Sequence, residues 1–353
     1  MSRSVLLTTA ALILLAGCRA PERAQAPAPA AAPGPAARMA PMLSPAQIEH
    51  GVPVAAPAET AAPPRAVGDA PAPVAPDPGL VRIQVLLDRS AFSPGMIDGL
   101  GGENTRQAIE AFREANHLGG GDQADQALLD SLTAADAAPV TAEYVLTAAD
   151  VAGPFSPPPV QDLTALAAAG TNFSSPLERL AERFHITEAL LQGLNPGVDF
   201  ARAGQRLVVP AVNDAPLAQV ARIVVDKGEK AVRAYDAAGR LLAFYPATIG
   251  SSDRPAPSGV LTVKGVANTP DYTYDPSRLT YGPGGGKVVV PAGPNNPVGT
   301  VWIDLSRDTY GIHGSPDPSK IGKTASHGCV RLTNWDVEQL AAAVKPGVVV
   351  RFV

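Results

Sequence analysis

Two short stretches near the C-terminus decide how this 353-residue chain is interpreted: Gly-Ile-His-Gly at residues 311–314 and Ala-Ser-His-Gly-Cys-Val-Arg-Leu at residues 325–332. They place His313 and Cys329 16 positions apart, a separation that a loop can close. The thiolate is the reactive form of cysteine, and a neighbouring imidazole lowers the pKa of a thiol. The two stretches therefore predict Cys329 as a nucleophile and His313 as its general base.

The glycines around the cysteine suggest how a tetrahedral intermediate would be stabilised. Attack on an amide carbonyl produces an oxyanion that needs N–H donors aimed at it. The backbone amides of Gly328 and Cys329 are candidates, because glycine lets the chain approach a substrate closely.

Three other interpretations of Cys329 use the same residues. His313, His327 and Cys329 could bind zinc, although only three ligands are evident and His-x-Cys is tight for one tetrahedral site. Cys329 could be an inert core thiol. It could also pair with the other cysteine of the chain, Cys18, in a disulfide.

The residues quoted above carry a family resemblance. His-Gly at 313–314, followed by Ser-His-Gly-Cys-x-Arg at 326–331, resembles the signature of the L,D-transpeptidase catalytic domain, and the resemblance extends over residues 220–353. It implies that Cys329 is the nucleophile and that His313 is a base held by a backbone carbonyl near Gly314. The substrate-binding or oxyanion residues that it implies are His327, Gly328, Arg331, Ser326 and Gly314.

The resemblance also implies a reaction. Cys329 would attack a tetrapeptide stem of peptidoglycan, release D-alanine and form a thioester, and an amine acceptor would then complete a 3-3 cross-link. No metal or organic cofactor is implied. Three alternatives stay open from the sequence: water as acceptor (an L,D-carboxypeptidase), a protein lysine as acceptor, or a non-catalytic protein that only binds the cell wall.

The pattern of residues 220–353 predicts a mainly β domain, a sandwich or a barrel, because many short β-branched or alternating apolar runs are separated by turns. These runs are 222–225, 231–235, 240–245, 259–266, 288–290, 300–305 and 348–353. One helix is expected over Trp335–Val344, with Thr333 and Asp336 as a capping box.

Two small modules are expected upstream. Residues 79–135 predict a helical domain with Asn104 as a helix N-cap; Pro-Gly-Met-Ile-Asp-Gly at 94–99 and the following helix resemble a peptidoglycan-binding domain. Residues 140–215 predict two short helices and a final strand, resembling a LysM glycan-binding module. Here about 28 residues intervene between the first strand, 144–147, and the first helix.

The N-terminus predicts export. Residues 1–17 have a basic start and an apolar run, as in a secretory signal, and Leu-Ala-Gly-Cys at 15–18 resembles the lipoprotein processing box, which implies lipidation of Cys18. Residues 18–78 predict a disordered tether, since the 60 residues from 19 to 78 contain 20 Ala and 15 Pro. We therefore expect a protein of the cell envelope or periplasm, attached to a membrane by lipid.

Charge and hydropathy exclude other classes and fit the expected partners. The net charge of −5 argues against a nucleic-acid partner. No apolar run reaches the ~20 residues of a membrane-spanning helix. Residues 220–353 hold 15 basic and 11 acidic side chains, an excess that suits anionic peptidoglycan stem peptides and glycan strands. The sequence thus predicts a multi-domain protein with a β catalytic domain, helical and α+β modules, and a tether.

Overall fold

The computed structural model describes residues 43–52, 74–213, 215–251, 254–277, 285–326 and 328–353. The expected signal peptide at 1–17 and Cys18 lie outside these residues, as does most of the expected tether. None of the helices within the described ranges combines the length and apolar character needed to cross a membrane.

The prediction of a disordered tether is wrong for residues 43–52. Helix α1 (Pro45–Glu49) forms there, and Ser44 and Gln47 cap it reciprocally. Ile48 is fully buried, and Glu49 accepts hydrogen bonds from Thr141. The composition of the whole segment hid this short anchor, because one buried isoleucine and a capping box suffice to fix a single helical turn against neighbouring elements.

The helical module consists of α2 (Pro78–Arg89), α3 (Glu103–Ala115) and α4 (Gln126–Ala135). The buried Gln84 joins α2 to the following loop and to α3, since its amide donates to Asp98 and Thr105. The prediction that Asn104 is the N-cap is wrong. Gly102 occupies that position, and the Asn104 side chain instead donates to the carbonyl of Ile321, 3.0 Å away.

The middle module, residues 140–215, is a two-stranded sheet with helices between its strands. Strands β1 (Thr141–Val145) and β2 (Arg206–Pro210) pair antiparallel. The helices between them are α5 (Ala148–Val151), α6 (Leu163–Ala169), α7 (Pro176–Arg183) and α8 (Glu188–Leu194). The expected pair of helices corresponds to α7 and α8, whereas α5 and α6 lie within the extra residues before them.

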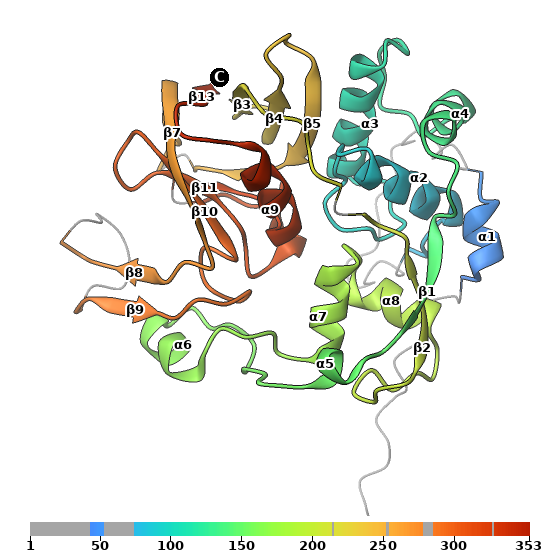
Figure 1. Ribbon diagram of the computed structural model, residues 1–353, viewed down its shortest axis with the longest axis horizontal. Helices are drawn as coiled ribbons and strands as arrows, with labels where there is room; N and C mark the ends of the chain where they lie inside the picture. The colour runs from blue at the N-terminus through green and yellow to red at the C-terminus, as the bar shows by residue number, and fades with distance from the viewer. Residues whose placement is uncertain (1–42, 53–73, 214, 252–253, 278–284, 327) are drawn as a thin grey trace, which may run out of the picture. The chain divides into compact units, whose positions relative to one another are not determined.

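Residues 220–353 form a mainly β, barrel-like domain, as the apolar pattern predicts. Its strands are β3 (Arg222–Asp226), β4 (Ala231–Tyr235), β5 (Leu241–Pro246), β6 (Thr248–Ile249), β7 (Gly259–Asn268), β8 (Tyr272–Tyr274), β9 (Val288–Val290), β10 (Val301–Leu305), β11 (Gly311–His313), β12 (Val330–Arg331) and β13 (Val349–Phe352). A short 3-10 helix, η1, spans Pro318–Lys320. Helix α9 (Asn334–Ala343) packs against β10 and β11 (Figure 1).

One long strand connects the two halves of the main sheet, whose order is β5-β4-β3-β13-β7-β10-β11-β12-β6. The first part of β7 pairs with β13 and the second part pairs with β10. The sheet therefore encloses one core, which includes Ile223, Ile303 and Val350. Strands β8 and β9 form a separate antiparallel pair.

All the longer predicted strands are confirmed, whereas four short ones escaped prediction. Strands β6, β8, β11 and β12 have two or three residues each, too few to show a period. Thr333 caps α9 as expected, but only half of the predicted capping box forms. The Asp336 carboxylate instead accepts a hydrogen bond from the Oγ of Ser93, 3.1 Å away. Ser93 belongs to the loop that follows α2.

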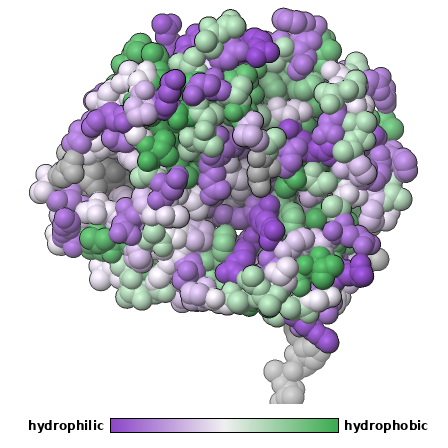
Figure 2. All heavy atoms as spheres, viewed as in Figure 1, coloured by the Kyte–Doolittle hydropathy of each residue, from purple (hydrophilic) through white to green (hydrophobic). Residues whose placement is uncertain are grey.

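The helical module and the β domain share buried contacts within residues 43–353. Phe92 pairs with Phe244 of β5 as an isolated bridge, and Ser93 N–H donates to the Phe244 carbonyl. Phe92 and Phe244 belong to one cluster of buried apolar side chains. On the face drawn in Figure 2, hydrophobic residues occur as small groups between hydrophilic ones.

Candidate active site

A row of four side chains crosses the end of the main sheet and forms the floor of a cleft. Thr248 of β6 is the register partner of Arg331, Arg331 is the partner of His313, and His313 is the partner of Trp302. Residues directly opposite each other on paired strands point to the same face. All four therefore line one cleft, whose volume is about 920 Å³.

Cys329 lines the same cleft. It directly precedes β12 and lies two positions before Arg331, which lines the cleft as well. Its Sγ is half-buried and lies 3.6 Å from the carbonyl oxygen of Thr309. Cys329, His313 and Arg331 thus line one cleft, and the roles that the sequence predicts for them stay predictions.

His313 is fixed in one tautomer by its backbone neighbour. Its Nδ1 lies 2.7 Å from the carbonyl oxygen of Gly314, and because a carbonyl can only accept, Nδ1 carries the proton. Nε2 is then left with its lone pair, the form needed in a general base. Burial, together with the positive charge of Arg331, lowers the pKa of His313 to about 3. The imidazole is therefore neutral at physiological pH.

The thiol of Cys329 differs from the sequence-based expectation. Burial raises its pKa above the ordinary value, while a backbone hydrogen bond to Gly311 and the charge of Arg331 act in the opposite direction. The sequence predicts that a neighbouring imidazolium lowers the pKa of this thiol. That effect is absent because His313 is uncharged. The resting pair is accordingly a neutral thiol and a neutral imidazole.

Gly311 makes room for the indole that covers His313. The ring of Trp302 stacks on the His313 ring, with centroids 5.4 Å apart and planes inclined by 21°. A Cβ atom at Gly311 would lie 2.5 Å from Cζ2 of Trp302, well inside contact distance. A glycine is therefore required on β11 for the tryptophan to reach the histidine.

The loop before Cys329 is held by a hydroxyl. Ser326 Oγ donates to the carbonyl of Cys329 at 2.6 Å and accepts from the N–H of Gly328 at 3.2 Å. Ser326 is buried and does not line the cleft, so its predicted part in substrate binding stays a prediction. The Gly328 amide already donates to Ser326 Oγ, whereas the Cys329 amide remains a candidate donor to the oxyanion, and both assignments stay predictions.

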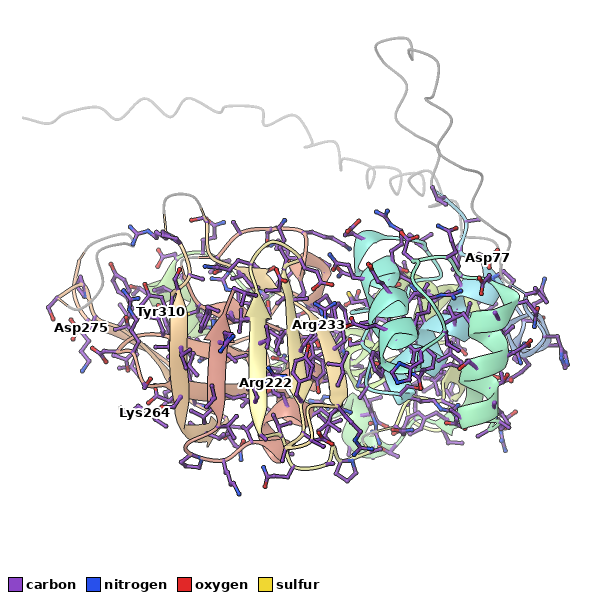
Figure 3. The ribbon with its side chains drawn as sticks, turned by 90° about the horizontal axis from the view of Figure 1, so that it is seen from above. Asp77, Arg222, Arg233, Lys264, Asp275 and Tyr310 are labelled. Carbon is purple, nitrogen blue, oxygen red and sulfur yellow. The ribbon has the colours of Figure 1, made fainter. Side chains whose placement is uncertain are left out.

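Gly328 itself has a steric requirement. Its φ is +111°, and a Cβ atom there would lie 3.0 Å from Cε1 of Tyr310. Tyr310 precedes β11 and is labelled in Figure 3 at one end of the sheet, on the side of the domain where Asp275 also lies. Gly314, the other glycine assigned to substrate binding, does not line the cleft and instead supplies the carbonyl that orients His313.

His327 lies outside the described residues, so its predicted support of the pocket stays a prediction. The zinc alternative depended on it. Among the residues that are described, no group of three or more His, Cys, Asp or Glu side chains is arranged to hold a metal ion. Cys329 is a free thiol in this part of the chain.

Sequence reasoning missed several residues that line the cleft. Thr248 and Trp302 belong to no sequence motif. Only the strand register places Thr248 beside Arg331 and Trp302 beside His313. Val160 and Leu163 belong to the middle module and lie more than a hundred positions away in the chain. Nothing in the sequence pattern signals that proximity.

Comparison with known proteins accounts for this arrangement. Residues 220–351 match the family model described as the L,D-transpeptidase catalytic domain. The chain is 33% identical over 175 residues to the "Putative L,D-transpeptidase YkuD" of Bacillus licheniformis, covering 48% of this chain and 89% of that relative. This chain belongs to the L,D-transpeptidase family. It is therefore an acyltransferase of that type.

Other proteins are similar to about the same share of the chain. The probable L,D-transpeptidase YcfS of Escherichia coli K12 is 32% identical over 191 residues, which span 52% of this chain and 60% of that one. Among solved structures, an L,D-transpeptidase from Mycobacterium smegmatis matches with a TM-score of 0.31 and 18% identity, over 42% of this chain and 63% of that chain.

Proposed function

We propose that this L,D-transpeptidase cross-links peptidoglycan stem peptides through a thioester on Cys329. The observation that carries the proposal is the single cleft shared by Cys329 and His313, with His313 Nδ1 bound to the Gly314 carbonyl. That hydrogen bond leaves Nε2 as the basic nitrogen. Family membership supplies the reaction class, and this geometry supports the roles proposed for the two residues.

The first half-reaction begins from the neutral pair. His313 Nε2 takes the thiol proton as Cys329 Sγ attacks the carbonyl carbon of the bond that precedes the terminal D-alanine. The Cys329 amide donates to the oxyanion. His313 then protonates the amine of D-alanine, the C–N bond breaks, and the acyl group remains on sulfur as a thioester.

The second half-reaction reverses these roles. An amine of a second stem attacks the thioester, His313 accepts its proton, and the sulfur leaves as a thiol when that proton returns. The products are a new amide bond and the free enzyme. Arg331 lies beside both groups and offers a guanidinium to a substrate carboxylate. His327 is proposed to support the same pocket.

The test is incubation of the purified protein with disaccharide-tetrapeptide muropeptides, followed by mass spectrometry. Cross-linked dimers and free D-alanine are expected, and Cys329→Ala should abolish both. Shortened stems without dimers would instead identify a carboxypeptidase, and unchanged muropeptides would leave a wall-binding protein. Full activity in Cys329→Ala would contradict the mechanism.

We also propose that the protein is exported and anchored by lipid on Cys18. The N-terminal sequence supports this, and so does a substrate located outside the cytoplasmic membrane. Metabolic labelling with palmitate should modify the native protein and not Cys18→Ser. Equal labelling of the two would remove the anchor from the proposal.

The upstream modules are proposed to bind glycan strands. The order of β1, α7, α8 and β2, with antiparallel outer strands, is the order expected for a LysM module. Co-sedimentation of the Cys329→Ala protein with purified peptidoglycan sacculi tests the idea. Recovery of the protein in the supernatant would assign the modules a purely structural role.

A further inference from the structure

The extra residues of the middle module reach the cleft of the β domain. Pro159, Val160, Gln161, Leu163 and Leu166 line the same cavity as Cys329 and His313. These residues belong to α6 and to the segment before it, between α5 and α7. The β domain therefore does not form the whole cleft, because one wall is supplied by a part of the chain that precedes it.

This wall is anchored at its base. The guanidinium of Arg179 on α7 donates to the carbonyls of Ala149, Asp150 and Ala152, the residues with which the insertion begins. The same guanidinium lies 4.9 Å from the ring centroid of Phe155. These contacts fix the direction in which the chain leaves α5.

The far end of the insertion is hydrogen-bonded to the β domain. Thr171 is buried, and its hydroxyl lies 2.9 Å from the carbonyl oxygens of both Pro291 and Ala292. Asn295 donates two hydrogen bonds to this end of the insertion. Its backbone N–H donates to the Thr171 carbonyl, and its side-chain amide donates to the Asn172 carbonyl. We call Thr171, Asn172 and Asn295 the clasp.

Helix α6 lies between these two anchors and packs against β9, as Figure 1 shows beside the β8–β9 pair. Leu166 is buried in that contact, whereas Val160 is 49% exposed and Leu163 is half-buried. Within the described chain Val160 thus presents apolar surface to the cleft. An apolar wall with a single amide, that of Gln161, faces a floor that carries Arg331.

Two features of this cleft, the guanidinium of Arg331 and the apolar wall, suit a short peptide. A peptide stem offers a carboxylate to the guanidinium, alanine methyl groups to an apolar wall, and backbone carbonyls to an amide donor. A volume of about 920 Å³ also exceeds what one reacting amide bond requires and lies at the upper end of ligand pockets.

We propose that residues 159–166 form a stem-peptide recognition wall for the active site. Val160 and Leu163 contact alanine methyl groups of the stem, and Gln161 donates to a stem carbonyl. This inference rests on the proposed function, since it names the substrate that the cleft receives. It makes the middle module a determinant of substrate affinity as well as a structural neighbour.

The test uses the full chain and a disaccharide-tetrapeptide as probe. Binding is measured by calorimetry in a Cys329→Ala background, which prevents turnover. Val160→Asp and Leu163→Ala should each raise Kd about tenfold. Leu163→Ala removes an apolar contact with the stem, and Val160→Asp places a charge against the apolar part of the stem. The matched control is Thr164→Ala, an exposed position of α6 that does not line the cleft; its Kd should stay within about twofold of the parent.

Two further measurements separate recognition from folding and from chemistry. Alkylation of Cys329 by iodoacetamide should proceed at the native rate in Leu163→Ala with Cys329 intact, because this substitution adds no charge to the cleft and the reagent does not need the wall. Thr171→Val, which removes the hydroxyl of the clasp, should also weaken binding of the muropeptide.

The outcomes distinguish the two proposals. Unchanged Kd in both Val160→Asp and Leu163→Ala would overturn the recognition wall, whether or not the enzyme forms cross-links. Binding of the muropeptide by the Cys329→Ala protein, together with a native protein that never forms dimers or shortened stems, would overturn the proposed function and leave the wall intact. No binding by the parent would overturn both.

Discussion

Asn334 Nδ2 lies 3.0 Å from Glu182 Oε2, joining the first residue of α9 to α7 of the middle module. Both side chains are buried. Asn334 Oδ1 also accepts from the N–H of Thr300, and it lies 2.3 Å from the position a Cβ atom would take on Gly314. A carboxyl of the middle module is therefore one side chain away from the residue that orients His313.

Glu182 is expected to make folding stability depend on pH. Burial, with the charges of Glu178 and Glu338, raises its pKa to about 8, although Asn334 acts in the opposite direction. The folded state thus holds a proton that the unfolded state releases near its ordinary pKa of 4.5. The stabilisation is complete below pH 4.5 and is lost as pH rises towards 8.

Glu182→Gln should flatten this dependence, because glutamine keeps the acceptor for Asn334 without a charge. We expect its melting temperature to exceed that of the native protein by about 2 °C at pH 8.5 and to be similar at pH 5. Thermal unfolding at a series of pH values measures the difference. Glu143→Gln, at an exposed carboxylate, is the matched control, and an identical slope in all three proteins would contradict the prediction.

The raised pKa of Cys329 predicts a specific reactivity profile. Its alkylation by iodoacetamide should accelerate continuously as pH rises from 6 through 9, since the reagent reacts with the thiolate. Mass spectrometry of the intact protein in samples quenched at successive times gives the rates. A plateau already established at pH 6 would show a thiolate–imidazolium pair and refute the neutral resting state.

Arg331 is predicted to tune that thiol as well as to bind substrate. Its charge lowers the pKa of Cys329, so Arg331→Gln should slow alkylation at pH 8 by a few fold. The same change should raise KM for muropeptides, because the cleft loses its guanidinium. Arg351→Gln, at an exposed position of β13, supplies the control. Faster alkylation in Arg331→Gln would reverse the assigned electrostatic effect.

The stacking of Trp302 on His313 predicts that Gly311 cannot be replaced. In Gly311→Ala the added methyl would meet the indole at 2.5 Å, so the ring must shift and uncover the imidazole. A loss of about 1–3 kcal/mol in the free energy of unfolding and about tenfold in kcat/KM is expected. Denaturant unfolding and muropeptide turnover measure these effects.

A glycine on the neighbouring part of the sheet gives the comparison. Gly265 lies on β7, and a Cβ atom there would have nothing within 4 Å. Gly265→Ala should therefore remain close to the native protein in both measurements. Equal effects of the two substitutions would indicate a general cost of alanine in this sheet and remove the specific role of Gly311.

The sequence by itself determined the family and most of the longer strands, and it supplied the candidate reactive pair. Cys329, His313 and Arg331 lie in short motifs whose chemistry is local, and the β-branched runs from β3 to β13 have the two-residue period that pairing requires. The helix N-cap at Thr333 could also be predicted from the sequence, because it depends on residues one helical turn apart.

Only the tertiary structure decided the protonation state of the pair and the full extent of the cleft. Burial is a property of the assembled fold, so the sequence pattern could not show that the imidazole is neutral or that the pKa of the Cys329 thiol is raised. The clasp at Thr171 joins segments about 120 positions apart. The wall at Val160 and Leu163 lies still farther along the chain from His313 and Cys329. Such contacts leave no period or motif in the chain.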